Sequence, residues 1–413
     1  MNPIQSVHIC GAGGIGTSGI ALLFHDAGCH VTATDIRESE ITARLQKAGI
    51  PFALGNRLDW VLQADAVVTP SQFPVNHAEV LAARDNHIPI LSRTEALLLL
   101  CKQFDIAPVI CIGTTARAKT AAILADMSPD AGFCFGLAIE GKTHAHFAKH
   151  IKHLIVDIDE RELFSHIDKL NACHGIHLIL SDWASNDLGY YDRAFSRTHF
   201  EASCMPCVTR YTRVIHDDTG KCFVCDSTND SHDRMIPLQI TYNSNGVTLS
   251  LDETEFHIPA CTLPDAQAFA VACVALGESP EHVLHPSPVG WFESIDDRRI
   301  FDIRMHPVNI HNAIQAMKSL FPRESLTVVI KPFQTTLDAY DFNLWRKAFA
   351  GAEQVLVMTP GYNVSDKGCR NLATALKMRG LRAAAHPKKQ ILAEYQPNGQ
   401  HQLWIGAPDM FKP

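Results

Sequence analysis

A glycine-rich turn near the amino terminus separates a predicted strand from a predicted helix. The turn contains Gly11, Gly13, Gly14 and Gly16. Glycine lets the backbone approach a ligand closely, and the N–H groups at a helix start favour negative charge, so this pattern suits the binding of a diphosphate. Asp35 ends the next predicted strand, where an acid can accept hydrogen bonds from a ribose or a base. A structural strand–turn–helix unit is the alternative.

A second predicted strand, at 109–112, also runs into a loop and a helix. The residues of this unit that could do chemistry are Gly113, Thr114, Lys119 and Thr120. Their spacing fits a phosphate-binding loop, in which the lysine reaches the β- and γ-phosphates and the threonine hydroxyl ligates Mg²⁺. Ala118 stands where such a loop has its second glycine, and its Cβ is expected to resist a positive φ. The alternative is an ordinary surface lysine at a helix start.

Two C-x-x-C pairs provide the strongest metal signal in the sequence. They are Cys204 with Cys207 and Cys222 with Cys225. Four thiolates at such spacing converge on a tetrahedral Zn²⁺. Because the segment between the pairs predicts a hairpin, we expect a zinc ribbon at about 200–228. Buried or redox-idle cysteines are the alternative.

These residues are positioned by a repeating strand–helix pattern. Alternation through residues 1–103 predicts a doubly wound, Rossmann-like α/β domain. The second loop opens a central P-loop-like α/β domain at 104–298, in which residues 200–260 predict successive strands with turns at DDTG and NSNG. Alternation resumes in a third domain, 299–413. A chain of 413 residues is too long for one core, so we expect these three domains.

Composition and charge exclude several classes of protein. With 46% hydrophobic and 19% charged residues the chain predicts a globular protein rather than a disordered one. The apolar runs are shorter than a membrane span, and no export signal is visible at the amino terminus. The net charge of −8 argues against general binding of nucleic acid or anionic membranes. Thirteen scattered cysteines suit a reducing compartment, so we expect a soluble cytoplasmic protein.

The stretch GAGGIGTSGIA resembles the UDP-binding opening of the Mur ligases, in particular those that add L-alanine or a peptide to UDP-N-acetylmuramate. In that family the loop holds the UDP diphosphate, which implies the same role here, with Ser18 included. Residues 69–100 are similar to the family's second sugar-nucleotide segment. Ser71 matches a family serine, Glu79 part of its Asn-Pro-Glu run, and Arg93 the arginine of Arg-Ala-Glu. The resemblance is strong to residue 100 and patchy beyond it.

The resemblance weakens in the predicted ATP and metal sites. The family has GTHGKTTT at the second loop, whereas this chain has two inserted residues and lacks a glycine. Asp157 stands where the family has a glutamate that helps to hold Mg²⁺, which implies a magnesium ligand shorter by one methylene. Asn186 replaces the family's metal-binding histidine, so this position is expected to have lost its role.

The remaining matches are single residues near the predicted third domain. Gln267 falls on the family's helix beside the adenine, and Arg298 or Arg299 with Asp302 falls on its hinge, where they would contact phosphate and ribose. His306 matches part of the family's His-His-Pro-Thr-Glu and is a candidate catalytic residue. The family's usual basic pair in this domain is missing here, and Lys331 is its nearest substitute.

Taken together, the resemblance implies an enzyme that phosphorylates a muramyl carboxylate with ATP and Mg²⁺, after which an amine of an amino acid or peptide displaces phosphate. Lys119, Asp157 and His306 would be its catalytic residues. Because several features are altered at once, catalysis is expected to be weakened. The competing hypothesis is a non-catalytic sensor of a UDP-sugar or nucleotide that works through a protein partner. A dinucleotide-dependent dehydrogenase is disfavoured, since nothing after residue 100 supplies a hydride-transfer site.

Overall fold

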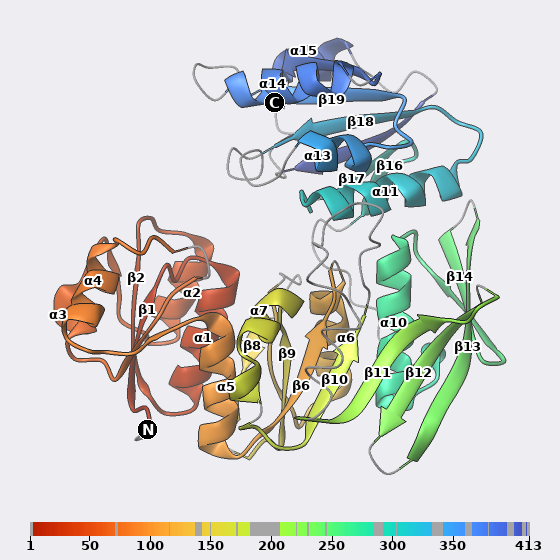
Figure 1. The fold of residues 1–413 in the computed structure, drawn as a ribbon. Helices are drawn as coiled ribbons and strands as arrows, with labels where there is room; N and C mark the ends of the chain where they lie inside the picture. The colour runs from red at the N-terminus through yellow and green to blue at the C-terminus, as the bar shows by residue number, and fades with distance from the viewer. Residues whose placement is uncertain are drawn as a thin grey trace.

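The computed structural model arranges the chain around three β-sheets of five, ten and six strands, which follow one another along the sequence (Figure 1). We call these parts the first, central and third lobes. The structure describes residues 3–70, 73–114, 116–136, 143–148, 150–170, 172–181, 207–219, 221–228, 231–243, 246–283, 292–302, 304–332, 342–359, 366–378, 380–394, 400–406 and 410. The predicted α/β class with parallel sheets is confirmed.

The first lobe is a parallel sheet in the order β3-β2-β1-β4-β5. Its elements are β1 (Ser6–Cys10), α1 (Ile15–Asp26), β2 (His30–Asp35), α2 (Glu40–Lys47), β3 (Phe52–Leu54), α3 (Leu58–Val61), β4 (Ala66–Val68), α4 (Ala78–Asp85), β5 (Ile90–Leu91) and α5 (Arg93–Phe104). The strand order reverses between β1 and β4. In open α/β sheets ligands bind at such a switch point, beyond the carboxyl ends of the strands.

The central lobe joins a parallel half-sheet to an antiparallel one. Its elements are β6 (Ala107–Ile112), α6 (Arg117–Met127), β7 (Gly132–Cys134), β8 (Ala145–His146), β9 (His153–Asp157), α7 (Glu160–Ser165), α8 (Ile167–Leu170), β10 (Ile176–Leu180), β11 (Val208–His216), β12 (Cys222–Thr228), β13 (Ser231–Asn243), β14 (Gly246–Leu251), β15 (Thr254–Ile258), α10 (Leu263–Leu276) and η3 (Pro280–His282). Strands β6, β7, β9, β10 and β11 run parallel, and β11 to β15 form successive antiparallel pairs. The predicted run of strands is confirmed for the described residues from Val208 to Ile258, while the turns at DDTG and NSNG include residues outside the described part of the chain.

The third lobe has the sheet order β16-β17-β21-β18-β19-β20. Its elements are β16 (Glu293–Asp296), β17 (Arg299–Asp302), α11 (Pro307–Leu320), β18 (Leu326–Lys331), α13 (Phe342–Ala348), β19 (Gln354–Thr359), α14 (Asp366–Lys377), β20 (Arg382–Pro387), α15 (Lys388–Glu394) and β21 (His401–Gly406). Strand β16 precedes residue 299 but belongs to this sheet. The predicted domain limits at 103/104 and 298/299 stay predictions.

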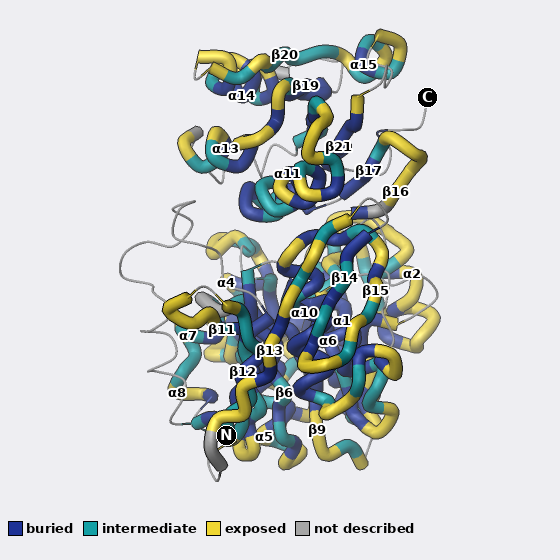
Figure 2. Tube along the Cα trace, turned by 90° about the vertical axis from the view of Figure 1, so that its right-hand side faces the viewer, coloured by how far each residue is buried: buried dark blue, intermediate teal, exposed yellow. Residues whose placement is uncertain are grey.

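The first and central lobes share one hydrophobic core. Phe24 of α1 and Leu97 of α5 belong to the same buried cluster as Leu154 of β9 and Leu178 of β10. The third lobe has its own clusters around Trp345 and Trp404 (Figure 2). The orientation of the first lobe on the central sheet is therefore fixed by packing, which also fixes any site between them.

Two glycines of α1 allow this close packing. A Cβ on Gly19 would lie 2.7 Å from the Cys134 sulfur of β7, and one on Gly16 would lie 3.1 Å from the Cδ of Arg93. Real Cβ atoms do not approach so closely, so a larger residue would push the helix away from its neighbours. These glycines serve the contact between lobes as well as the loop. Across the described chain, no helix is long and apolar enough to cross a lipid bilayer.

Candidate functional site

The turn after β1 forms a compact loop, and Gly11 at its beginning lines a pocket. Gly11 has a φ of +65°, and the Thr17 hydroxyl donates to its carbonyl at 2.6 Å. Gly14 occupies the N-cap of α1 without a side-chain cap, and the first N–H groups of a helix have no partner within it. The adjoining pocket has a volume of about 190 Å³ and is lined by Gly11, Asp35, Phe73, Glu79 and their neighbours. The predicted diphosphate loop thus has the expected shape.

Asp35 braces this loop from the end of β2. Its Oδ2 accepts a hydrogen bond from the Gly13 N–H at 2.8 Å, and its Oδ1 accepts one from the Ile36 N–H at 2.7 Å. A Cβ on Gly13 would lie 2.9 Å from Oδ2, so the carboxylate fits only against a glycine. Asp35 also lines the pocket. Its predicted contact with a ribose stays a prediction, but its first role is to hold the loop.

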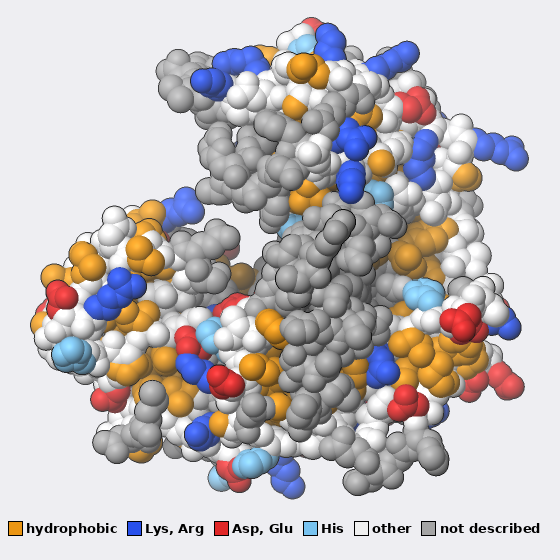
Figure 3. Space-filling view, in the orientation of Figure 1, with side chains coloured by type: hydrophobic (Ala, Val, Ile, Leu, Met, Phe, Trp, Pro, Cys, Tyr) orange, Lys and Arg blue, Asp and Glu red, His pale blue; other side chains and the backbone are white. Residues whose placement is uncertain are grey.

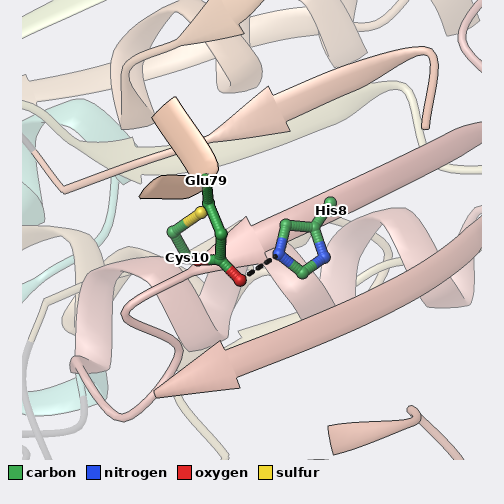
Figure 4. A group of neighbouring side chains, drawn as sticks. All are labelled: His8, Cys10 and Glu79. Atoms are coloured by element: carbon green, nitrogen blue, oxygen red, sulfur yellow. Dashed lines mark hydrogen bonds and ion pairs between the residues drawn. The ribbon is translucent and has the colours of Figure 1, made fainter. Parts of the chain in front are cut away.

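A buried polar cluster that sequence reasoning did not single out lies beneath the pocket. His8, Cys10 and Glu79 place their polar atoms within 4.8 Å of one another, and Figure 4 shows them converging from β1 and α4. Glu79 accepts hydrogen bonds from the Arg57 N–H at 2.8 Å and the Thr34 hydroxyl at 3.1 Å, and lies 3.3 Å from His8 Nε2. Because these donors already surround the carboxylate, the cluster supports the sheet edge rather than offering an open metal site.

The electrostatics of this cluster follow from its hydrogen bonds. Burial alone would raise the pKa of Glu79, but the bonds from His8 and the Arg57 N–H outweigh it and lower the pKa to about 2. Burial and the nearby carboxylate raise the pKa of the Cys10 thiol, which therefore stays protonated. The i, i+2 spacing of His8 and Cys10 in a strand could have shown that both side chains share one face.

One residue assigned to the UDP loop, Ser18, faces the central lobe instead. Ser18 is fully buried, donates to the Ile15 carbonyl at 3.0 Å and lies 2.9 Å from His144 Nε2. In this arrangement the hydroxyl is engaged with protein groups, and its predicted contact with a diphosphate stays a prediction. Burial, followed by the charges of Arg44 and Arg93, lowers the pKa of His144 to about 4, so the imidazole is neutral at this contact. Ser71 lies outside the described residues.

Arg93 connects the start of α5 to the end of β9. Its guanidinium donates to the Asp157 carbonyl at 2.5 Å, to Asp157 Oδ1 at 2.8 Å and to the Cys134 carbonyl at 3.3 Å. Burial acts to lower the pKa of Arg93, but the charge of Asp157 outweighs it and raises the pKa above its ordinary value. Arg93 therefore holds the predicted magnesium ligand, and its predicted contact with a sugar nucleotide stays a prediction.

The second loop lies at the aligned carboxyl ends of three parallel strands. Cys111 pairs in register with Asp157, and Ile112 pairs with Leu180. This register brings together Gly113 with its φ of +145°, Asp157 and Ser181. Thr114 follows Gly113 and is half-buried. The loop therefore occupies the edge where α/β proteins bind ligands, as predicted.

Helix α6 begins at Arg117, with Ala116 as its N-cap. Ala118 lies within the helix and is absent from the positive-φ residues of the described chain, so the expected backbone strain at this alanine is wrong. The inserted residues extend the loop so that position 118 needs no glycine. Lys119 is 4% exposed, and the Thr120 hydroxyl lies 2.6 Å from the Ser181 hydroxyl.

The residues expected to hold magnesium are already engaged with protein groups. Asp157 Oδ1 accepts from Arg93 and from the Gly136 N–H at 2.9 Å, and Oδ2 lies 3.9 Å from Arg117 Nε. Mg²⁺ requires near-octahedral oxygen ligands at about 2.0–2.1 Å. Arg93 occupies a lone pair of Oδ1, and the positive charges of both guanidinium groups beside the carboxylate repel a divalent cation. The residues in this arrangement do not fit the metal. Asn186 lies outside the described residues.

A buried ion network connects the central lobe to the third. Arg304 lies 2.7 Å from Asp302 and 3.1 Å from Asp265 at the start of α10. Burial raises the pKa of Asp265, but the charges of Arg304 and Lys119 outweigh it and lower the pKa to about 2. At Asp302 burial prevails and raises the pKa despite Arg304. Arg304 is bonded to the Asp302 carboxylate, and the predicted ribose contact of Asp302 stays a prediction.

The other predicted residues of the hinge and third lobe have local partners. Arg299 pairs with Asp296 at 2.6 Å within the turn between β16 and β17, and its predicted phosphate contact stays a prediction. His306 caps α11 by accepting the Val308 N–H at 3.2 Å, and its catalytic role stays a prediction. Gln267 lies half-buried on α10, where its contact with an adenine also stays a prediction.

The described cysteines of the predicted zinc ribbon do not converge in this structure, and the ribbon stays a prediction. Cys222 and Cys225 belong to one extended strand, and at that spacing their side chains leave on opposite faces. Cys225 is opposite Arg213 on β11, which places it about 20 Å from Cys207 at the usual rise of a strand. A hairpin in full register separates the pairs that a ribbon would bring together. Cys204 lies outside the described residues.

A larger cavity of about 910 Å³ lies at the opposite end of the central sheet. Its lining includes Val109, Ile155, Gly175 and Thr209, near the amino ends of their strands or before them. None of the predicted site residues lines it. The candidate site is therefore the pair of loops, not this cavity. Figure 3 shows the surface hollowed between the first and third lobes.

Comparison with known proteins gives a partial domain match and relatives over the whole chain. Residues 6–105 match the family described as Mur ligase family, catalytic domain. A UDP-N-acetylmuramate–L-alanine ligase of Desulfotalea psychrophila is 25% identical over 441 positions, covering 95% of this chain and 92% of that protein. One from Myxococcus xanthus is 36% identical over 139 residues, which are 33% of this chain and 29% of that protein. The higher identity is confined to about a third of the chain.

Two solved structures have a similar overall arrangement. A UDP-N-acetylmuramate-alanine ligase from Thermotoga maritima aligns with a TM-score of 0.70 at 20% identity, covering 98% of this chain and 96% of that one. A murein peptide ligase from Psychrobacter arcticus aligns with a TM-score of 0.57 at 14% identity, covering 97% and 95%. At these identities the likeness concerns the fold.

Proposed function

We propose that this chain, which carries a Mur ligase family domain, is an ATP-dependent ligase that acts on a UDP-N-acetylmuramyl substrate. The observation that carries this proposal is the pair of loops, each at the carboxyl edge of a parallel sheet and each followed by a helix. The first suits a diphosphate and the second a nucleotide phosphate. The acceptor is an amine of an amino acid or peptide.

The first loop binds and orients the sugar nucleotide. The start of α1 presents its free N–H groups to the diphosphate, and Gly14 leaves the approach open. Asp35 fixes the turn through Gly13, so the loop is already in its binding conformation before the ligand arrives. Preorganisation of this kind lowers the entropic cost of binding.

The second loop supplies the positive charge for phosphoryl transfer. Lys119 sits in the first turn of α6, where a transferring phosphate would meet both its ammonium and the helix start. The muramyl carboxylate takes the γ-phosphoryl group, ADP leaves, and the amine then displaces phosphate to form the amide. No step is assigned to a metal, because Asp157 is held by two arginines.

Turnover is expected to be slow. Removing one group that stabilises developing charge typically costs about 10²-fold or more in rate. Asp157 is paired, Asn186 replaces a family histidine, and the family's basic pair in the last domain is missing. Because residues that act together are not additive, their separate losses do not multiply.

A second function, non-catalytic sensing of a UDP-sugar or nucleotide, is favoured by one observation. Arg93 links the first lobe directly to the end of β9, so a ligand at either loop acts on the same junction. A sensor needs this coupling but needs no turnover. The two functions differ in whether amide product accumulates.

Phosphate release and mass spectrometry of the products decide between them. Purified protein is incubated with UDP-N-acetylmuramate, ATP and a panel of amino acids and peptides. The ligase proposal expects an amide product that depends on all three reactants, at a rate well below the usual 10 or so per second. Lys119→Ala should abolish the product, whereas Lys47→Ala, on the exposed face of α2, should not. Tight binding of the sugar nucleotide without product would establish the sensor.

A further inference from the structure

We propose that Arg117, together with Arg93, takes the place of the divalent cation at the second loop, so that this loop binds nucleotide phosphate without Mg²⁺. The inference rests on the proposal that the loop binds ATP. It goes further by naming the positive charges that would stabilise the nucleotide phosphates in place of the metal. It concerns three elements: the loop before α6, the end of β9 and the start of α5.

The first argument is the position of Arg117 in its own loop. Its Nη1 donates to the Gly113 carbonyl at 2.9 Å, its Nε lies 3.9 Å from Asp157 Oδ2, and its Nη2 lies 3.7 Å from Asp159. One guanidinium thus spans the loop start, the end of β9 and the acid that follows it. A bridging divalent cation would make the same connections.

The second argument is electrostatic. Arg117 occupies the first turn of α6, where a cation faces the positive end of the helix dipole and is disfavoured. The ion pairs of Arg117 with Asp157 and Asp159 offset this unfavourable interaction with the dipole. The same two carboxylates would be the ligands of a bound metal. A guanidinium carries fixed charge at every physiological pH and presents planar N–H donors to carboxylates. Its charge is available without a dissolved ion.

The third argument is the state of both predicted magnesium ligands. Asp157 Oδ1 already accepts two hydrogen bonds, from Arg93 and from the Gly136 N–H. The Thr120 hydroxyl lies 2.6 Å from the Ser181 hydroxyl and 3.3 Å from the Ala116 carbonyl. A metal would have to displace hydrogen-bond partners at Asp157 Oδ1 and at Thr120, and at Asp157 Oδ2 it would lie beside the Arg117 guanidinium. Repulsion between these charges is strong at a buried site.

Residues of two lobes form this arrangement, because Arg93 belongs to α5 of the first lobe and Asp157 to β9 of the central lobe. Its side chain is 15% exposed and that of Asp157 is 7% exposed, so this ion pair is shielded from water and salt. The pair holds the Asp157 carboxylate in position, and Arg117 then meets its other oxygen. Removal of Arg117 alone leaves Asp157 anchored but exposes one carboxylate oxygen and Asp159 to an added cation.

The test compares nucleotide and metal binding with and without Arg117. ADP is titrated by calorimetry into the full chain in excess EDTA and, separately, in millimolar MgCl₂. Mn²⁺ binding is followed in parallel, without nucleotide, by the loss of the free-ion signal in electron paramagnetic resonance. The variants are Arg117→Ala and Arg117→Gln, the second keeping the stem of the side chain. Arg323→Ala, an exposed arginine of the third lobe, is the matched control.

The wild type should bind ADP equally well, within about twofold, in EDTA and in MgCl₂. Arg117→Ala and Arg117→Gln should bind Mn²⁺ at least about tenfold more tightly than the wild type, and Arg323→Ala should not. Wild-type ADP affinity that rises about tenfold or more with Mg²⁺ would overturn the proposal. Equal Mn²⁺ affinity in wild type and both Arg117 variants would overturn it as well. Loss of ADP binding under all conditions counts against the proposed ATP site, while the Mn²⁺ arm still decides the role of Arg117.

Discussion

The first loop and the second loop are built on the same strand–loop–helix plan and differ in what fills them. The first, from Gly11 to Gly16, is held from behind by Asp35 and opens onto a pocket of about 190 Å³. In the second, the Arg117 side chain at the start of α6 extends across the loop. It contacts the Gly113 carbonyl, Asp157 at the end of β9 and Asp159 just after it. The first loop is therefore held by the carboxylate of Asp35, which comes from a neighbouring strand. The second is held by the guanidinium of Arg117, which belongs to the helix that follows the loop.

This difference shows why a phosphate-loop pattern does not by itself establish metal chemistry. Both loops place a helix start at the carboxyl edge of a parallel sheet, which is enough to attract an anion. The metal depends on a carboxylate with free lone pairs. Among the described residues, the Asp35 carboxylate has only backbone N–H groups as partners, whereas Asp157 Oδ1 accepts from Arg93 and Gly136 and a second guanidinium, that of Arg117, faces its Oδ2.

The largest expected effect is on stability at the second loop. Asp157→Ala leaves Arg93 with an uncompensated buried charge, so the free energy of unfolding should fall by about 3–5 kcal/mol. Urea unfolding measures it. Asp159→Ala is the matched control, because that acid is 33% exposed and its pairing with Arg117 contributes about 1 kcal/mol or less. Equal losses in the two variants would show that the Arg93–Asp157 pair is not a buried anchor.

A smaller effect, dependent on pH, tests the contact of α1 with the central sheet. The pKa of His144 is lowered to about 4 in the folded protein, below the ordinary 6.5, chiefly by burial. As pH falls from 6.5 to 4, the unfolded chain binds this proton and the folded chain does not, so stability is lost through that window. The expected loss is on the order of 3 kcal/mol.

His144→Gln supplies the control for that pH dependence. Glutamine cannot titrate, so the difference in stability between variant and wild type should change across this window and level off below pH 4. A difference that stays constant from pH 7 to pH 4 would mean that His144 is solvated and that α1 does not seal this contact. Chemical denaturation at a series of pH values is the measurement.

The smallest expected effect on stability belongs to the first loop. Asp35→Ala removes the acceptor of the half-buried Gly13 N–H, which should cost about 1–2 kcal/mol in unfolding free energy. It should also weaken binding of UDP-N-acetylmuramate, because the loop loses its brace. Asp35→Asn, which keeps an acceptor oxygen, should restore most of both losses. If Asp35→Ala bound UDP-N-acetylmuramate as tightly as the wild type, Asp35 would have no role in the binding site.

The fold was largely predictable from the sequence because its signals are local. Glycine turns, alternating apolar strands and helix ends such as Thr262 before α10 depend on nearby residues. The site was only partly predictable, because the partners of a charged side chain depend on tertiary contacts. Arg93 and Asp157 are far apart in sequence and meet only through the packing of α5 against the central sheet.

The two differences between sequence and structure with the clearest physical cause are of this kind. Cys222 and Cys225 have ribbon spacing, but the strand that carries them pairs in register with β11 and, over these two cysteines, with β13, and its extended backbone turns their side chains to opposite faces. Arg304 was not singled out, although its position two residues after Asp302 allows the close ion pair that forms. Neither the strand register nor the burial of this pair can be read from spacing alone.

The most direct test of the account is calorimetric titration of UDP-N-acetylmuramate into the wild type and Gly14→Val. The wild type should bind the sugar nucleotide through the first loop, and a valine at the N-cap of α1 should abolish this binding by covering the helix start. Ala43→Val, on the exposed side of α2, should bind as the wild type does. Absence of heat at millimolar ligand, or tighter binding of NAD, would contradict the account.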